Sequence, residues 1–495
     1  MARPSRRRAA VALALVAGLG GGLLAPATAG AATTAHVPAA VQPLPGEWWW
    51  SAMGVDELHR KGTGKGVTVA VIDGPIDSSV PELRGRVASS RSFCNDPRRG
   101  TDFVKRSPRA TGKDAEHATS MAALIAGSGK GTGPGGRGIR GIAPDATIRH
   151  YAVSYLAADG SYRCGVKLPD GTEQNQAIAD AIRQAAVDGA DVISISLVSN
   201  FTASMVGALQ AAYGHDAIVV AGTPNENVVP QWPGLGNGVL LVNTVDRQAR
   251  IPSFAVQGSP FISLTAPGKD VMAASYDASG WHSETVASGS SIATALVSGG
   301  IAALRSAYPS ATSGQILHAV KDNVGLRKSG SGYETWFRRV GTDLPPVRTA
   351  NKAYGWGIFD PTDAVAVDPT TLPKDNPFVR EGAAEEPSVA EVAAAMGLAG
   401  ASASASPTPS ASASSAPAAS TSDADTAQDS GTPWLPVGIG VVVVALLAAG
   451  GGALARRSRA PGPIDPSHPD PSRTDEVATG DPTSQGAVGA EGRKH

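Results

Sequence analysis

Three side chains far apart in the sequence, Asp73, His117 and Ser291, could together perform nucleophilic hydrolysis. That chemistry needs a hydroxyl that attacks, a base that takes its proton and a carboxylate that orients the base. Each residue alone has a simpler explanation, namely a turn aspartate, a partly exposed histidine at a helix start and a serine that caps a helix. The order Asp, His, Ser, with one residue at a strand end and two at helix starts, favours the catalytic interpretation.

An alternation of strand and helix patterns must position these residues. Buried strands are expected over 66–72, 190–196, 217–221 and 239–243, and helices over 119–126, 177–188, 203–213 and 291–307. Apolar strands separated by helices predict an α/β fold with a doubly wound, mostly parallel sheet. Ligands in such folds bind at the carboxyl ends of strands, where Asp73, Ser196 and the turn 222–225 are expected.

The motifs around these residues resemble, in order, those of the subtilisin-like serine peptidases, or subtilases. The matching segments are the strand with the catalytic aspartate (69–73), the His-Gly-Thr motif (117–119), the substrate-binding strand (191–197), the Ala-Pro-Gly motif (266–268), the nucleophile motif (289–293) and the end of the domain (354–360). The resemblance covers most of residues 43–372. It implies a subtilisin-like fold and serine endopeptidase activity.

The resemblance also implies a role for each side chain. Asp73 would hold the tautomer of His117, His117 would take the proton of Ser291, and Ser291 would attack a peptide carbonyl. The backbone N–H of Ser291, at a helix N-terminus, would donate to the oxyanion. The implied substrate-binding residues are Ser196, Leu197 and Val198. The mechanism requires no cofactor and no metal, and no set of calcium ligands is legible in the sequence.

The second oxyanion donor is the main departure from the family pattern. The family's Ala-Ala-Gly-Asn aligns on 220–223, so Thr223 replaces the asparagine unless Asn225 takes its place. The donor is therefore Thr223 or Asn225, and losing such a donor lowers turnover about 10²–10³-fold. Val198 stands where the family usually has glycine, which would narrow the pocket for the residue before the scissile bond. The smaller departures are Gly74, Ala118, Ser290 and Ala295.

Two functional hypotheses from different classes follow. The complete set of Asp73, His117 and Ser291 favours an active protease of narrow specificity. The altered oxyanion position favours a subtilase-fold pseudoenzyme that serves as a structural partner of a membrane secretion channel. We adopt the enzyme as the primary hypothesis, with labelling of Ser291 as the test that separates the two.

The ends of the chain predict export and membrane attachment. Residues 1–32 have the positive, apolar and Ala-x-Ala regions of a secretory signal peptide, with an uncleaved anchor as the alternative. Residues 434–455 carry no charge and, as a helix, are long enough to cross the roughly 30 Å apolar core of a bilayer. A buried core helix is the alternative. Three arginines follow this segment, which predicts a cytoplasmic C-terminus and an extracellular peptidase domain.

The rest of the chain is assigned by composition. We expect an N-terminal extension at 33–62, the peptidase domain at 63–372, a Ser/Ala/Pro-rich stalk at 373–433, the transmembrane helix at 434–455 and a cytoplasmic tail at 456–495. The extension is too short to fold alone and should pack on the domain. This organisation resembles the mycosins, membrane-anchored proteases of actinobacterial type VII secretion, which implies a secretion membrane complex as partner.

Charge and cysteine content limit the partners and sites further. The net charge of -1 provides no global basic field, so a nucleic-acid partner is not expected, and the substrate is a protein or peptide. Two cysteines exclude a disulfide-dense scaffold and a four-cysteine zinc site. On an exported chain the pair Cys94 and Cys164 favours a disulfide, with two free buried thiols as the alternative. The bond would tether the loop before His117 to the one after Tyr151.

Overall fold

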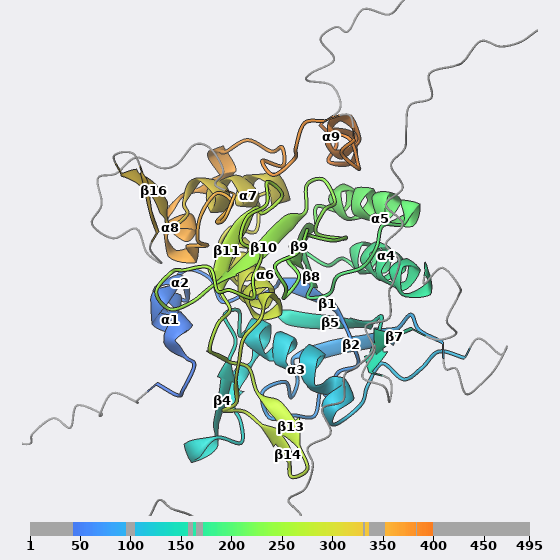
Figure 1. Cartoon of the computed structure of the whole chain (residues 1–495), viewed down its shortest axis with the longest axis vertical. Helices are drawn as coiled ribbons and strands as arrows, with labels where there is room; N and C mark the ends of the chain where they lie inside the picture. The colour runs from blue at the N-terminus through green and yellow to red at the C-terminus, as the bar shows by residue number, and fades with distance from the viewer. Residues whose placement is uncertain are drawn as a thin grey trace, which may run out of the picture. The chain divides into compact units, whose positions relative to one another are not determined.

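A computed structural model gives the structure of the chain (Figure 1). It describes residues 43–95, 104–156, 162–164, 172–329, 332–335, 352–382 and 384–398. The predicted signal peptide, transmembrane helix and cytoplasmic tail lie outside these residues, as does the stalk from residue 399 onward. Among the described residues, no helix has both the length and the apolar character needed to cross a membrane.

A seven-stranded sheet forms the centre of the domain, in the order β11-β10-β9-β8-β1-β5-β2. Its strands in chain order are β1 (Thr68–Asp73), β2 (Val87–Ser92), β5 (Thr147–Ala152), β8 (Val192–Ile195), β9 (Ile218–Gly222), β10 (Leu240–Val245) and β11 (Leu264–Pro267). Every neighbouring pair in this sheet is parallel. The predicted α/β fold with a mostly parallel sheet is confirmed.

Helices cover both faces of this sheet (Figure 1). The longer ones are α3 (Lys113–Ala126), α4 (Thr172–Val187), α5 (Ala203–Gly214), α6 (Ser290–Ala307) and α7 (Ser313–Asp322). Alternate residues of β1 point to opposite faces, as a strand requires. Val69 and Val71 are buried in one core with α3 and α6, whereas Ala70 and Ile72 are buried in a second core with α4 and α5. The predicted doubly wound arrangement follows from this alternation.

Besides the central sheet, the described residues form small two-stranded antiparallel sheets. They pair β3 (Ser128–Lys130) with β4 (Arg137–Arg140), β6 (Tyr155–Leu156) with β7 (Tyr162–Arg163), β12 (Val271–Met272) with β15 (Val286–Ala287), β13 (Ser275–Asp277) with β14 (Gly280–His282), and β16 (Leu326–Ser329) with β17 (Gly332–Thr335). A disulfide joins Cys94, after β2, to Cys164, after β7.

The N-terminal extension is part of the main core. It forms two short helices, α1 (Trp48–Ala52) and α2 (Val55–Leu58). Trp49, Met53 and Leu58 are buried in the same core as α3 and α6. Gly46 approaches the backbone of Met272 so closely that a Cβ there would lie 2.3 Å from the Met272 nitrogen. For residues 43–62, the expected packing of the extension on the domain is therefore observed.

The packed part of the chain continues past residue 372, where the sequence placed the end of the peptidase domain. Two short helices, α8 (Pro361–Ala366) and α9 (Val389–Ala395), lie on either side of this boundary. Phe378 and Val392 are buried, and Val392 packs in the core that contains α5. The stalk prediction at 373–433 therefore needs correction, because residues 373–382 and 384–398 bury apolar side chains on the domain. The nearly pure Ser/Ala/Thr/Pro composition begins only at Ala401.

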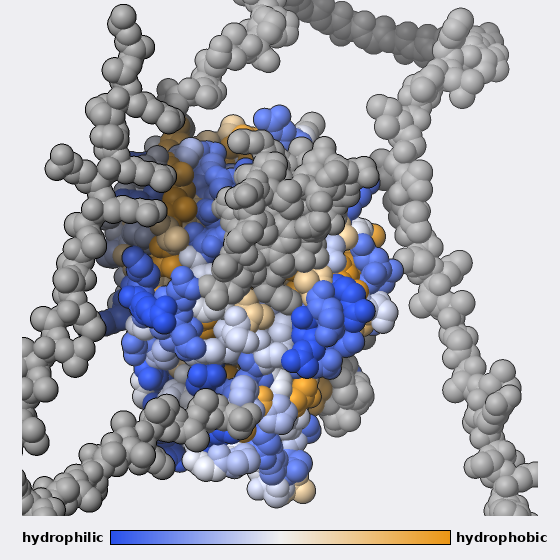
Figure 2. Space-filling model, turned by 90° about the vertical axis from the view of Figure 1, so that its left-hand side faces the viewer, coloured by the Kyte–Doolittle hydropathy of each residue, from blue (hydrophilic) through white to orange (hydrophobic). Residues whose placement is uncertain are grey.

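The surface of the domain is mixed in character. Figure 2 shows one face, on which hydrophilic side chains are interspersed with smaller hydrophobic areas. Such mixing is usual, because apolar atoms supply more than half of the accessible surface of folded proteins.

Candidate active site

β1 and α3 bring a carboxylate and an imidazole together. Asp73 is the last residue of β1 and is 1% exposed, while His117 lies in the second turn of α3. His117 Nδ1 lies 2.8 Å from Asp73 Oδ1 and 2.9 Å from Oδ2. Because an ionised carboxylate can only accept hydrogen bonds, Nδ1 carries the proton. The neutral ring then presents the lone pair of Nε2 as a base.

Opposing effects set the pKa of His117. Burial lowers this pKa, whereas the charge of Asp73, the hydrogen bond to it and the charge of Glu116 raise it. The net direction is upward from the ordinary value of 6.5. Because only the neutral ring can accept a proton, the site gains its base as the pH rises through this raised pKa.

Ser291 is the second residue of α6 and faces the same site. Its Oγ donates to the backbone carbonyl of Ser196 at 3.3 Å, and Ser196 Oγ donates in return to the Ser291 carbonyl at 3.2 Å. His117 and Ser291 line the same two cavities. To reach His117 Nε2 the hydroxyl must turn away from Ser196, and catalytic hydrogen bonds in ligand-free sites often form only when substrate binds.

Thr223 and Asn225 differ in where their side chains point. Thr223 is 2% exposed and its hydroxyl donates to Asn243 Oδ1 at 3.1 Å, in the interior. Asn225 is exposed, and its Oδ1 accepts the backbone N–H of Ser290 at 2.8 Å. Its amide nitrogen would lie 3.3 Å from a Cβ added at Gly289, so this amide lies against the nucleophile turn.

A cavity of about 400 Å³ opens beside Ser291. Its lining includes His117, Ser196, Leu197, Val198, Gly222, Thr223, Pro224, Asn225, Ser290 and Ser291. The structure thus brings together the predicted nucleophile, base, oxyanion candidates and substrate-binding residues, with Asp73 behind His117. A second cavity of about 210 Å³ shares His117, Asn225 and Ser291 with the first, and its lining also includes Ala273 and Ala287.

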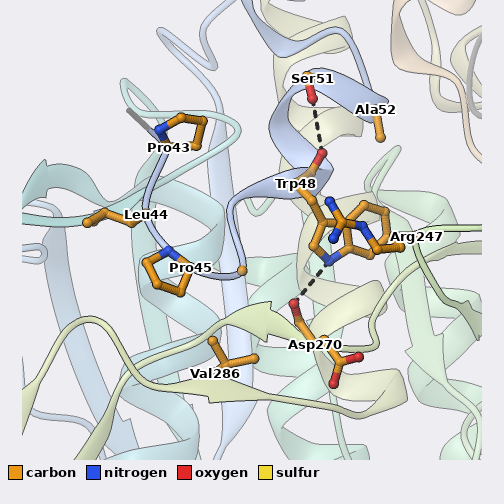
Figure 3. A pocket seen from close by; sticks show the side chains of 10 residues that line it. Pro43, Leu44, Pro45, Trp48, Ser51, Ala52, Arg247, Asp270 and Val286 are labelled. Atoms are coloured by element: carbon orange, nitrogen blue, oxygen red, sulfur yellow. Dashed lines mark hydrogen bonds between the residues drawn. The ribbon is translucent and has the colours of Figure 1, made fainter. Parts of the chain in front are cut away.

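The predicted Cys94 and Cys164 pair lies outside these cavities. Its disulfide anchors the loop that follows β2. A larger cavity, of about 770 Å³, also lies apart from the catalytic residues (Figure 3). The N-terminal extension forms most of the lining of this cavity. Trp48 and Asp270 both line it, and the indole N–H of Trp48 donates to the Asp270 carbonyl at 3.0 Å.

Sequence reasoning missed one buried residue that contacts the site. His150, on β5, is 0% exposed and its Nε2 lies 2.7 Å from the carbonyl oxygen of Gly74, the residue after Asp73. The segment that forms β5 contains Arg149 and His150 and lacks the apolar run of the other central strands. A histidine in an unrecognised strand gives no local signal, so only the pairing of β5 with β1 reveals this contact.

Comparison with known proteins identifies the family of the chain. A family model described as the subtilase family matches residues 64–357, which is more than half of the chain. Mycosin-1 of Mycobacterium tuberculosis is 27% identical over 394 residues, covering 71% of this chain and 82% of that protein. Thermitase of Thermoactinomyces vulgaris is 29% identical over 273 residues, covering 54% of this chain and 84% of that protein.

Solved structures share the fold. The crystal structure of MycP1 from Mycobacterium smegmatis has a TM-score of 0.50 at 22% identity, covering 71% of this chain and 90% of that one. The crystal structure of MycP1 from the ESX-1 type VII secretion system has a TM-score of 0.50 at 20% identity, covering 69% of this chain and 90% of that one. By the extent of the family match, the chain belongs to the subtilase family of serine endopeptidases.

Proposed function

We propose that this protein is an exported, membrane-anchored endopeptidase that hydrolyses peptide bonds with Asp73, His117 and Ser291. The observation that carries the proposal is the contact of His117 Nδ1 with both Asp73 oxygens, at 2.8 and 2.9 Å, beside the cavity that holds Ser291. This contact fixes the tautomer whose free Nε2 can take the proton of a serine hydroxyl.

In the proposed reaction, Ser291 Oγ attacks the peptide carbonyl carbon while His117 Nε2 accepts the hydroxyl proton. Asp73 stabilises the imidazolium that forms. The backbone N–H of Ser291 and the side-chain amide of Asn225 donate to the oxyanion. His117 then protonates the leaving amine, and a water molecule that it deprotonates hydrolyses the acyl-enzyme.

The substrate strand carries the specificity in this proposal. Ser196, Leu197 and Val198 would bind the peptide backbone as an added strand. Apart from His117, the lining of the 400 Å³ cavity beside Ser291 is uncharged. Val198 is 36% exposed at its edge. An uncharged residue of limited size before the scissile bond fits this lining.

The cellular setting is also a proposal. Residues 434–455 would anchor the protein with the peptidase domain outside the cell and the C-terminus in the cytoplasm. An association with a type VII secretion membrane complex is supported by the similarity to Mycosin-1 over 71% of this chain and by the likeness to MycP1 from the ESX-1 type VII secretion system. Protease protection of the C-terminal tail in intact cells, with digestion of the peptidase domain, tests this topology.

Labelling of the full-length protein in membranes with a fluorophosphonate probe tests the proposed catalysis. We expect label on the wild type and on Ser288→Ala, which alters an exposed serine of the same turn, and no label on Ser291→Ala. An unlabelled wild type that is folded would reject the enzyme. It would favour the alternative, in which the domain is an inactive structural partner of the secretion machinery.

A further inference from the structure

A buried histidine that the proposed mechanism does not use lies behind Asp73. His150 is 0% exposed, and its Nε2 lies 2.7 Å from the Gly74 carbonyl oxygen. Its Nδ1 lies 2.7 Å from Ser90 Oγ. A carbonyl oxygen can only accept, so Nε2 carries the ring proton and Nδ1 accepts the hydroxyl proton of Ser90. Both nitrogens of the neutral ring are therefore occupied.

The surroundings of His150 keep the ring neutral. Burial lowers the pKa of His150 to about 4, against the raising effects of the Gly74 hydrogen bond and the Asp73 charge. The charge of Arg109 lowers this pKa further. At neutral pH the ring thus has one donor, and this donor is committed to Gly74.

Gly74 connects this ring to the catalytic carboxylate. The N–H of Gly74 donates to Asp73 Oδ1 at 2.7 Å, while its carbonyl accepts from His150. The parallel pairing of β1 with β5 places Val71 opposite His150 and Asp73 opposite Ala152. The residue that follows Asp73 is therefore held at one end by the carboxylate and at the other by the imidazole.

Gly74 has no side chain with which to support the turn itself. A Cβ at this position would meet only ordinary contacts, with the Asp114 and Ser154 carbonyl oxygens at 3.6 Å. The hydroxyl of Ser154 is buried and has no hydrogen-bond partner within the described residues, so it does not hold the turn either. The side-chain hydrogen bond that holds the Gly74 carbonyl is the one from His150.

We propose that His150 is a positioning residue for the peptidase reaction, which fixes the Gly74 turn so that Asp73 stays aligned with His117 Nδ1. The inference rests on the roles of Asp73 and His117 in the proposed function. It adds the hydrogen bond from His150 on β5 to Gly74 at the end of β1, behind the catalytic pair.

Two amide substitutions separate this role from simple packing. In His150→Gln the side-chain amide can reach the place of Nε2 and donate to Gly74, whereas in His150→Asn it reaches only the place of Nδ1. We expect kcat to fall about 10- to 100-fold in His150→Asn, since small misplacements of catalytic groups have effects of this size. KM should change less than about 2-fold, and His150→Gln should recover kcat to within about 3-fold of the wild type.

The pKa of His117 provides a second measurement that does not require turnover. Asp73 raises this pKa through its charge and its hydrogen bond, and Glu116 adds to the increase. If Asp73 loses its alignment, the pKa of His117 falls. NMR titration of the His117 ring in a Ser291→Ala background should show a lowered pKa for His150→Asn and an unchanged one for His150→Gln. A packing defect alone would lower Tm without moving this pKa.

Ser90→Ala is the matched control, because it removes the other hydrogen bond of the same ring and leaves the bond to Gly74. It should lower Tm but keep the pKa of His117 and keep kcat within about 3-fold of the wild type. A folded His150→Asn protein with wild-type kcat and an unchanged His117 pKa overturns the inference. If the wild type itself proves inactive, the proposed function fails, and the titration alone then decides the role of His150.

Discussion

Asn225 and Thr223 bind different partners, and this difference decides which of them can stabilise an oxyanion. The Thr223 hydroxyl is committed to Asn243 in the interior, whereas the Asn225 amide lies against the turn that carries Ser291. We expect Asn225→Ala to lower kcat about 10²–10³-fold. Thr223→Val should change kcat less than about 3-fold but cost about 1–3 kcal/mol of unfolding free energy, because Asn243 loses a buried donor. Steady-state kinetics and denaturant unfolding measure the two effects.

Asn225→Asp is the control for the structural part of this effect. An aspartate can still accept the Ser290 N–H that Asn225 Oδ1 accepts at 2.8 Å, but it has no amide to donate. It should therefore be as impaired as Asn225→Ala. If Thr223→Val is instead the more impaired variant, the oxyanion donor has been assigned to the wrong residue.

The pH dependence of the reaction follows from the His117 and Asp73 pair. The pKa of His117 lies above 6.5, and only its neutral form is a base, so kcat/KM should rise with pH along a limb centred above 6.5. Asp73→Asn removes the charge that raises this pKa. We expect the limb to move to lower pH and kcat to fall about 10⁴-fold. A pH profile of both proteins tests this, and a limb that does not move would contradict it.

Among single residues, the sequence alone identifies those that lie in local motifs. Asp73, His117 and Ser291 each stand in a short recognisable segment, and the fold brings all three to one site. His150 could not be found in this way, because its partners Ser90 and Gly74 are 60 and 76 positions away and the bonds depend on strand register. The choice between Thr223 and Asn225 also required the direction of each side chain.

The buried aspartate that caps the N-terminus of helix α8 makes the free energy of unfolding depend on pH. Asp360 is 1% exposed, and its Oδ1 caps the helix by accepting the N–H groups of Thr362 and Asp363, each at 3.1 Å. Its Oδ2 has no hydrogen-bond partner within the described part of the chain. Burial raises the pKa of Asp360 to about 6. The folded state therefore binds the proton more tightly than the unfolded chain does.

The sign of the stability effect follows from this raised pKa. The unfolded carboxyl loses its proton near pH 3.8, whereas the folded one keeps it until about pH 6, so the free energy of unfolding falls between these values and stays lower above them. Asp360→Asn keeps the cap without the charge. It should raise the unfolding free energy at pH 7.5 by about 1–3 kcal/mol and change it little at pH 4. Denaturant titrations at both pH values measure this, and destabilisation at pH 7.5 would refute it.

Among the elements, those with strong apolar runs were predictable. Strands β1, β8, β9 and β10 and helices α5 and α6 fall where the sequence patterns place them. Helices α3 and α4 begin earlier than predicted, at Lys113 rather than residue 119 and at Thr172 rather than residue 177, so His117 lies in the second turn of α3 and not at its start. β2 is an edge strand with the sequence VASSRS, and its exposed polar residues give no strand signal. β5 also gives a weak strand signal, because Arg149 and His150 interrupt its apolar run. β5 is set by pairing with β1 and β2, and β2 by pairing with β5, rather than by local preference.

For the molecule as a whole, the burial of side chains locates the ends of the folded domain better than sequence composition does. Trp49 and Leu58 of the extension are buried in the core with α3 and α6, which agrees with an extension too short to fold alone. At the other end, low complexity marks only the chain from Ala401 onward. The burial of Phe378 and Val392 depends on partners in distant segments, which composition does not report.

Chains that end after residue 398 and after residue 372 should therefore differ in stability. The shorter chain loses Phe378 and Val392, which are 5% and 2% exposed, and the hydrogen bond from Asn376 Nδ2 to the Gly238 carbonyl at 2.8 Å. Removing a large buried apolar side chain costs about 2–5 kcal/mol, so Tm should drop clearly in the shorter chain. The longer chain should unfold at the same temperature as one that ends after residue 433.

Val392→Ala within the longer chain provides the matched control, because it removes one contact with the α5 core and keeps the segment. It should lower Tm by less than the complete deletion does. Thermal unfolding at equal protein concentration measures all four proteins. Equal Tm values for the chains that end after 372 and 398 would restore the domain boundary that composition alone predicts. A lower Tm for the shorter chain would instead make residues 373–398 an integral part of the peptidase domain.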